Sequence, residues 1–184
     1  SPYNATLKGL EFDLQLQFRK MRNFMKGVVF SANLTLMDSK MNYFETLKSR
    51  IKNPDFTPGG TEKPFLPTNS DIIYTDRLLK QPSLLFNVSL GYDYKKFSGR
   101  ISCNYQDGVL IAEQHRQDAA DVESTRPFVK WDMQLKYSLT RQFSLYATLS
   151  NFTQSSDRKR RDITNYPSRV EYYGSAAYIG FKYD

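Results

Sequence analysis

The chain has a single histidine, and it stands among acidic residues, a composition found in many metal sites. Around His115 lie Glu113, Asp118, Asp121 and Glu123. These carboxylates follow no regular interval, whereas metal ligands need tightly defined geometry. The sequence places no recognisable serine nucleophile or orienting aspartate beside this histidine, so a serine–histidine–aspartate triad is not expected. No glycine-rich phosphate loop is present either. We therefore predict no resident metal, no cofactor, no catalytic residue and no enzymatic activity.

A second chemical feature is the basic run Arg158-Lys159-Arg160-Arg161. Such a run binds phosphate oxygens through charge-assisted hydrogen bonds, which suggests lipopolysaccharide or another anionic ligand. A solvated loop tip is the simpler interpretation. The net charge of +7 is also compatible with nucleic acid. However, the other basic residues are scattered and the aromatic residues recur along strands, so we do not expect a nucleic-acid partner.

The elements that must position these residues are β-strands, because apolar and polar residues alternate with a period of two. In the clearest segment, SLLFNVSLGYDYKKFSGRIS at 83–102, a two-residue connection at Lys95-Lys96 joins two alternating runs. The same alternation recurs elsewhere and predicts an all-β protein with about seven strands. We expect them near 6–18, 28–36, 86–94, 97–104, 129–137, 143–150 and 174–183.

The connections between these strands are alternately short and long. The short ones lie at 19–26, at Lys95-Lys96 and at Thr140-Arg141, and the long ones at about 38–82, 106–127 and 153–171. The first long connection is rich in Pro and Gly, so we expect little regular structure there, apart from a hidden strand at 71–75. In the second, residues 109–111 are expected to extend the preceding strand. This order is typical of an antiparallel up-and-down transmembrane barrel with short turns at one rim.

The distribution of side chains favours a membrane barrel over a soluble one. Aromatic residues gather beside the short turns and predict a girdle at a membrane interface; they are Phe18, Phe24, Tyr94, Phe97, Tyr137, Phe143, Phe181 and Tyr183. The other face carries mostly short uncharged polar residues, which suit a wet lumen. Low mean hydropathy excludes helical membrane proteins only, since alternate residues of a barrel strand contact lipid.

Several segments resemble strands of TonB-dependent outer-membrane receptors. The resemblance covers nearly the whole chain apart from the long connections. The segments are NATLKGLEFDL at 4–14, GVVFSANLTLMDS at 27–39, QPSLLFNVSLGYD at 81–93, Trp131-Asp132, LSNFT at 149–153, Tyr173-Gly174 and Ile179-Gly180-Phe181. One departure is Asp184, which follows the aromatic residue that usually ends the family's last strand.

The resemblance implies that residues 1–184 are about the C-terminal third of a twenty-two-stranded barrel, without its plug domain and earlier strands. It implies energy-coupled import of a large scarce nutrient, such as a siderophore, cobalamin or a glycan, across the outer membrane of a Gram-negative bacterium. The implied partners are outer-membrane lipid and lipopolysaccharide, the TonB energy-transducing complex through the plug, and a surface lipoprotein.

Ligand contacts are expected from aromatic residues in the long connections. Our candidates are Tyr43, Phe44, Phe65, Tyr74, His115 and Tyr166. Two other interpretations of the whole chain stay open. One is a complete small outer-membrane barrel of about eight strands with a structural or adhesive role. The other is a soluble ligand-carrier barrel whose apolar face points inward.

Overall fold

The alternating segments form strands, and the chain is almost entirely β-structure. The computed structural model describes residues 4–18, 23–61, 63–116, 119–161 and 167–183. The elements are β1 (Ala5–Gln17), the 3₁₀ helix η1 (Asn23–Gly27), β2 (Val28–Lys52), β3 (Phe65–Asp76), β4 (Leu84–Tyr94), β5 (Phe97–Gln106), β6 (Leu110–Arg116), β7 (Ala119–Thr125), β8 (Phe128–Ser138), β9 (Phe143–Ser150), β10 (Ser156–Arg161), β11 (Pro167–Tyr172) and β12 (Ala176–Tyr183).

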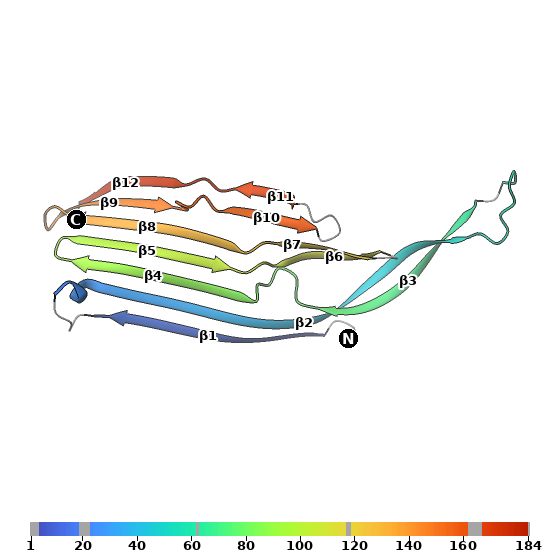
Figure 1. The fold of residues 1–184 in the computed structure, drawn as a ribbon, viewed down its shortest axis with the longest axis horizontal. Helices are drawn as coiled ribbons and strands as arrows, with labels where there is room; N and C mark the ends of the chain where they lie inside the picture. Colours follow the sequence, from blue (N-terminus) through green and yellow to red (C-terminus); the bar gives the residue numbers. More distant parts are fainter. Residues whose placement is uncertain (1–3, 19–22, 62, 117–118, 162–166, 184) are drawn as a thin grey trace.

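The main sheet has eight strands. Seven of them form a continuous antiparallel path in the order β1-β2-β4-β5-β8-β9-β12, and β3 pairs with β2 off this path. The all-β, up-and-down arrangement is therefore confirmed, and each of the seven expected segments forms a strand of this path. The count of about seven was too low, because the described part of the chain has twelve strands. The strands lie side by side in one layer, with β1 and β12 at opposite edges of an open sheet (Figure 1). No helix in the described part of the chain is long and apolar enough to cross a membrane.

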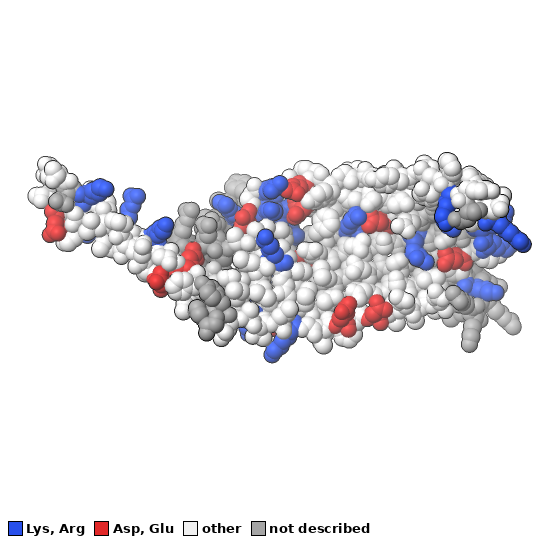
Figure 2. Space-filling view, turned by 180° about the vertical axis from the view of Figure 1, so that it is seen from behind, with Lys and Arg blue, Asp and Glu red and all other residues white. Residues whose placement is uncertain are grey.

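The strand register collects the apolar residues on one face of the main sheet. One apolar row consists of Leu14, Ala32, Val88, Cys103 and Trp131. The neighbouring row points to the other face and consists of Asp13, Asn33, Asn87, Asn104 and Lys130. Figure 2 shows this polar face, with charged side chains scattered over the sheet and gathered toward its ends.

The apolar face has almost no protein packed against it. Among the described residues, the buried hydrophobic side chains are Cys103, Val109 and Leu110, whereas Leu90 is 51% exposed and Ile179 is 87% exposed. Exposed apolar patches of this extent are unstable in water. The open single layer also encloses no apolar interior, so it does not support the soluble-carrier interpretation.

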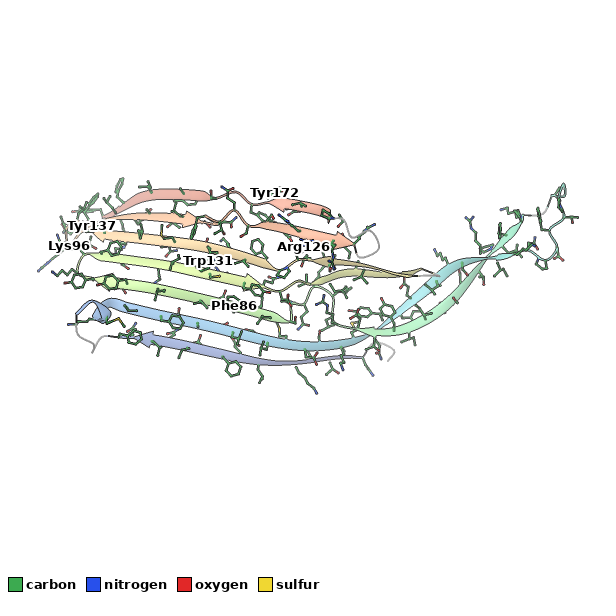
Figure 3. All side chains as sticks on the ribbon, viewed as in Figure 1. Phe86, Lys96, Arg126, Trp131, Tyr137 and Tyr172 are labelled. Atoms are coloured by element: carbon green, nitrogen blue, oxygen red, sulfur yellow. The ribbon has the colours of Figure 1, made fainter. Side chains whose placement is uncertain are left out.

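Two belts of aromatic residues border the apolar face. At the short turns Tyr94 pairs with Phe97, which pairs with Tyr137. At the other end Phe86 stacks on Tyr105 with ring centroids 4.7 Å apart. Figure 3 shows Tyr137 and Lys96 at one end of the sheet and Phe86 and Trp131 toward the other. Paired aromatic belts are typical of barrels that span a bilayer.

The prediction that 38–82 has little regular structure was wrong. β2 continues to Lys52 and pairs with β3 over twelve residue pairs, from Met41↔Asp76 to Lys52↔Phe65. Most of the Pro and Gly residues that suggested a loop lie in the hairpin tip, between residues 53 and 64. Pro67 stands in β3, an edge strand, where a missing N–H is tolerated. The hidden strand at 71–75 is confirmed as part of β3, but it pairs outside the seven-stranded path.

The other two long connections also contain strands. A four-stranded sheet with the order β11-β10-β7-β6 stands at the end of the main sheet opposite the short turns. The basic run 158–161 therefore lies in β10 and not at a loop tip. Residues 109–111 do not extend β5, which ends at Gln106; Leu110 begins β6 and is 2% exposed. These apolar residues form a small core beneath the hairpins.

Candidate functional site

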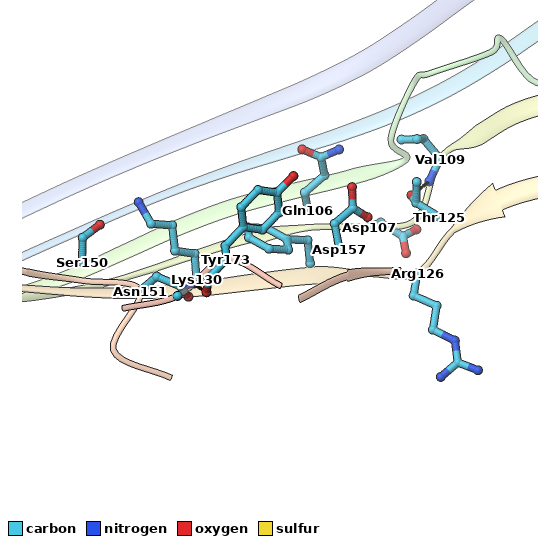
Figure 4. Close-up of a pocket in the computed structure, with 12 residues that line it drawn as sticks. Gln106, Asp107, Val109, Thr125, Arg126, Lys130, Ser150, Asn151, Asp157 and Tyr173 are labelled. Atoms are coloured by element: carbon cyan, nitrogen blue, oxygen red, sulfur yellow. Dashed lines mark hydrogen bonds between the residues drawn. The ribbon is translucent and has the colours of Figure 1, made fainter. Parts of the chain in front are cut away.

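A hollow opens on the polar side of the sheet, where the main strands pass into the outer hairpins. We call it the cup. Its volume is about 570 Å³. It is lined by Gln106, Asp107, Val109, Thr125, Arg126, Phe128, Lys130, Ser150, Asn151, Asp157, Tyr173 and Gly174 (Figure 4). These residues come from five separate segments of the chain, which strand pairing and side-chain hydrogen bonds bring together.

Asn151 holds the corner at which β9 turns into β10. It is 4% exposed and has a positive φ of 50°, a conformation that asparagine tolerates better than most residues. Its side-chain Nδ2 donates to the backbone oxygen of Tyr173 at 2.6 Å, and its Oδ1 accepts from the backbone N–H of Ser155 at 3.1 Å. One amide side chain thus ties the start of β10 to the end of β11.

Asp132 supports the same corner from β8. Its Oδ1 accepts from the Ser150 hydroxyl and from the Asn151 backbone N–H, both at 2.9 Å. Its Oδ2 lies 3.2 Å from Nζ of Lys130. The Asp132 carboxylate therefore holds the Lys130 ammonium group at the floor of the cup and also fixes the end of β9.

Two aromatic rings form the apolar wall of the cup. Phe128 and Tyr173 meet edge to face with their centroids 6.2 Å apart. The Tyr173 hydroxyl donates to Oε2 of Glu171 at 2.7 Å, and Arg169 lies 2.5 Å from the same carboxylate. This hydrogen bond, together with the arginine charge, lowers the pKa of Glu171, and the same contact raises the pKa of the Tyr173 phenol. Tyr173 therefore stays neutral, with its hydroxyl engaged and its ring beside the cup.

The cup combines an aromatic wall with amide, carboxylate and ammonium groups, which is the composition of a site that binds a polar organic ligand. Among the described residues, no three His, Cys, Asp or Glu side chains gather as metal ligands would. Arg126 borders the cup, but Figure 4 shows its guanidinium directed away from the other lining side chains.

Among the six ligand residues suggested by the sequence, the described part of the structure brings Tyr43 and Tyr74 together. Tyr43 and Tyr74 stack with their centroids 5.4 Å apart. The Tyr43 hydroxyl also donates to the oxygen of Arg77 and accepts from the N–H of Leu79, both at 3.0 Å, so it anchors the connection from β3 to β4.

The other candidates are not gathered with this pair where the structure describes them. Phe44 and Phe65 are 46% and 53% exposed along the β2–β3 hairpin. His115 stands in β6, where its backbone pairs with that of Ala120. Tyr166 lies outside the described residues. Of the acids around His115, Glu123 accepts from the Ser168 hydroxyl at 3.0 Å, and Asp118 lies outside the described residues.

Sequence reasoning missed the cup, although a signal was present. In β8 the apolar face begins with Val129, so the residue before it, Phe128, belongs to the opposite, polar face. An aromatic residue is unexpected on that face. Tyr173 directly follows Tyr172, the last residue of β11, so two aromatic residues stand together at the end of that strand. An aromatic residue in the polar phase near a long connection is thus a marker for a binding surface on the lumen side.

The comparisons with known proteins agree with this geometry. A family model described as "TonB dependent receptor-like, beta-barrel" matches residues 2–152, which is most of the chain. Neither a search of curated proteins nor a search of solved structures gave a match. The family consists of receptors and transporters of the Gram-negative outer membrane, which act with TonB and are not enzymes. The two-faced open sheet and the family match agree, and the chain belongs to the TonB-dependent receptors as part of their β-barrel.

Proposed function

We propose that this chain is the C-terminal part of a receptor that imports a large scarce nutrient, of the siderophore, cobalamin or glycan class, using energy from the TonB complex. Residues 1–184 would supply barrel wall, lumen surface and outer hairpins, and a plug domain elsewhere in the protein would contact TonB. The supporting observation is the cup, which stands on the lumen side at the level of the outer hairpins, where an arriving ligand would first meet the barrel.

Both edges of the main sheet support the proposal of a larger barrel. The outer edges of β1 and β12 pair with no other strand in the described part of the chain. In lipid each unpaired backbone group costs roughly several kcal/mol, because no water is present to hydrogen-bond with it. Further strands between these edges would remove that cost, and a barrel of this family would provide them.

Within the cup, Phe128 and Tyr173 would contact the apolar part of the ligand. Lys130 and Gln106 would bind its polar groups. The exposed rings of Phe44 and Phe65 on the long hairpin, together with the other sequence candidates, would add contacts further out. A surface lipoprotein covering the hairpins is part of the same proposal, because it would close the cup from outside.

The size of the native protein tests the proposal first. Outer membranes of the source bacterium are blotted with an antibody raised against the β2–β3 hairpin. A band several-fold above 21.4 kDa, the mass of these 184 residues, is expected. A single band near that mass would refute the import proposal and favour a complete small barrel with a structural or adhesive role.

A growth experiment tests import itself. A strain lacking the gene is grown with iron, cobalamin or glycan carbon source limiting in turn, beside a strain lacking TonB. We expect a defect on one nutrient class in both strains, and restoration by the intact gene. A double Phe128→Ala/Tyr173→Ala variant should restore growth poorly although its amount in the membrane is unchanged. Equal growth of the deletion strain on every nutrient would contradict the proposal.

A further inference from the structure

The cup is rich in hydrogen-bond acceptors that carry negative charge. Two of its lining residues, Asp107 and Asp157, have carboxylate side chains, and both are half-buried. In the described part of the chain no hydrogen bond to the Asp157 carboxylate is found. The basic residue on the same side of β10, Lys159, does not line the cup. Because an ionised carboxylate accepts about four hydrogen bonds and donates none, Asp157 offers unused acceptor sites to a ligand in the cup.

Asp107 adds a second set of acceptor sites. Its Oδ1 accepts from the backbone N–H of Gly108 at 2.8 Å, and its Oδ2 accepts from the Ser83 hydroxyl at 2.7 Å. Figure 4 shows Asp107 and Gln106 directed to the same side, opposite to Arg126. The two hydrogen bonds fix the orientation of the Asp107 carboxylate, and each of its oxygens keeps a further lone pair for a ligand.

The positive charges beside the cup are less available to a ligand than these carboxylates. Nζ of Lys130 lies 3.2 Å from Oδ2 of Asp132, and the guanidinium group of Arg126 is directed away from the other lining side chains. The charge of Arg169 is held by the Glu171 carboxylate. An anionic ligand would meet two carboxylates and would compete with a third for the lysine, so the cup disfavours anions.

A neutral carbohydrate fits this arrangement of groups. Its hydroxyls donate to the carboxylates and also accept, as the amide of Gln106 and the hydroxyl of Thr125 require. The Thr125 oxygen already accepts from the backbone N–H of Val109 at 2.9 Å, which leaves its proton to donate. The C–H face of a sugar ring is apolar and packs against the rings of Phe128 and Tyr173. The cup volume of about 570 Å³ is within the range of about 300–1,000 Å³ for small-ligand sites.

We propose that Asp107 and Asp157 determine the specificity of the cup, which binds a neutral carbohydrate through their acceptor oxygens and excludes anionic ligands. The inference rests on the proposed function, because it takes the cup as the ligand site of the receptor, and it selects one of the three nutrient classes. A polyanionic ferric complex is repelled by both carboxylates. A small cation leaves the donors of Gln106 and Lys130 unused, whereas hydroxyl groups use donors and acceptors together.

A glycan array read with the whole purified receptor in detergent tests this proposal. The array carries neutral oligosaccharides, each beside its uronate counterpart of the same linkage, and cationic chitosan oligomers beside their N-acetylated forms. We expect wild type to bind a neutral oligosaccharide at least about tenfold more tightly than the uronate. Asp157→Asn keeps the shape but removes the charge, so neutral binding should weaken by about tenfold. Its preference over the uronate should fall to about threefold or less.

The matched control is Asp13→Asn, which removes the same charge from the lumen face of β1, a strand that contributes no residue to the cup. It should keep both affinities within about twofold of wild type. The proposal is overturned if no neutral oligosaccharide binds, if uronates bind equally well, or if chitosan oligomers bind more tightly than their N-acetylated forms. Equal weakening of neutral and uronate binding in Asp157→Asn would overturn it too, because that result indicates a structural role. Faster gel migration of the unheated barrel confirms that each variant is assembled.

The growth experiment separates failure of this inference from failure of the import proposal. A deletion strain whose growth is impaired only when iron or cobalamin is limiting would overturn the carbohydrate assignment and leave import intact. A deletion strain that grows normally on every nutrient would refute import, while the array still decides whether the cup binds a neutral carbohydrate.

Discussion

The hydrogen bonds of Asn151 should hold the β10–β11 hairpin closed, and replacing this residue should open it. Asn151→Ala removes the bonds to the Tyr173 oxygen and from the Ser155 N–H. Each bond contributes about 1 kcal/mol. Alanine at a positive φ costs roughly 1 kcal/mol more. The expected loss is therefore about 3 kcal/mol, whereas Asn151→Gly, which tolerates the backbone conformation, should lose about 2 kcal/mol.

Limited trypsin digestion of the whole receptor in lipid vesicles measures this loss, since β10 carries four consecutive basic residues, 158–161. When opening is fast relative to cleavage, the cleavage rate follows the open population. A loss of 3 kcal/mol then raises the rate by about 150-fold, and a loss of 2 kcal/mol by about 30-fold. Asn87→Ala is the control, because Asn87 is exposed on β4 and has no side-chain hydrogen bond in the described structure.

Two results would refute this reasoning. One is a cleavage rate for Asn151→Ala that stays within about threefold of Asn87→Ala, since that corresponds to less than 1 kcal/mol. The other is a glycine variant that is cleaved as fast as the alanine variant, which would mean that the positive φ carries no cost. In that case the corner would be held by strand pairing and not by the amide side chain.

Three further predictions follow from single contacts. Because the Tyr173 hydroxyl donates to Glu171 and lowers its pKa, this contact stabilises β11 at neutral pH. This stabilisation is lost as the pH falls below the ordinary glutamate pKa of about 4.3 and then through the lowered pKa of Glu171. Over that pH range, amide hydrogen exchange in β11, corrected for the intrinsic rate, should become faster in wild type but not in Glu171→Gln. Leu90→Arg, at mid-height on the apolar face, should impair barrel assembly by about 2–4 kcal/mol, whereas Ser89→Arg on the lumen face should not, as the fraction of heat-modifiable barrel will report. Gly108→Ala would place a methyl group 2.3 Å from a β7 backbone oxygen, so we expect a loss of about 1–3 kcal/mol and faster proteolysis of the β6–β7 hairpin.

The main sheet could be predicted from the sequence because neighbouring residues within each strand show where the strand lies and which face is apolar. In β4 the alternation of Phe86, Val88 and Leu90 with Asn87 and Ser89 sets both the strand and its two faces within a few residues. The two-residue turn then fixes the register of the next strand. Seven such segments were sufficient to predict the seven-stranded path and its two-sided character.

The extension of β2 could have been recognised, because its alternation inverts. Up to Leu36 the even-numbered residues are apolar, but Asp38 and Lys40 continue that phase as charged residues, while Met41 and Tyr43 occupy the other phase. Charged residues in a phase that was apolar are expected where a barrel strand passes from lipid into water. If a strand is expected to keep its apolar residues on one face throughout, β2 is predicted to end here. In the structure, its pairing with β3 continues to Lys52.

The cup depended on tertiary structure. Phe128 meets Tyr173, and Asn151 reaches the same residue across twenty-two positions of sequence. No local pattern specifies which distant hairpins pair, or which way a strand turns after an irregular junction, since both depend on contacts between remote backbone groups. Periodicity therefore gave the barrel wall, whereas long-range strand pairing decided which side chains form its binding surfaces.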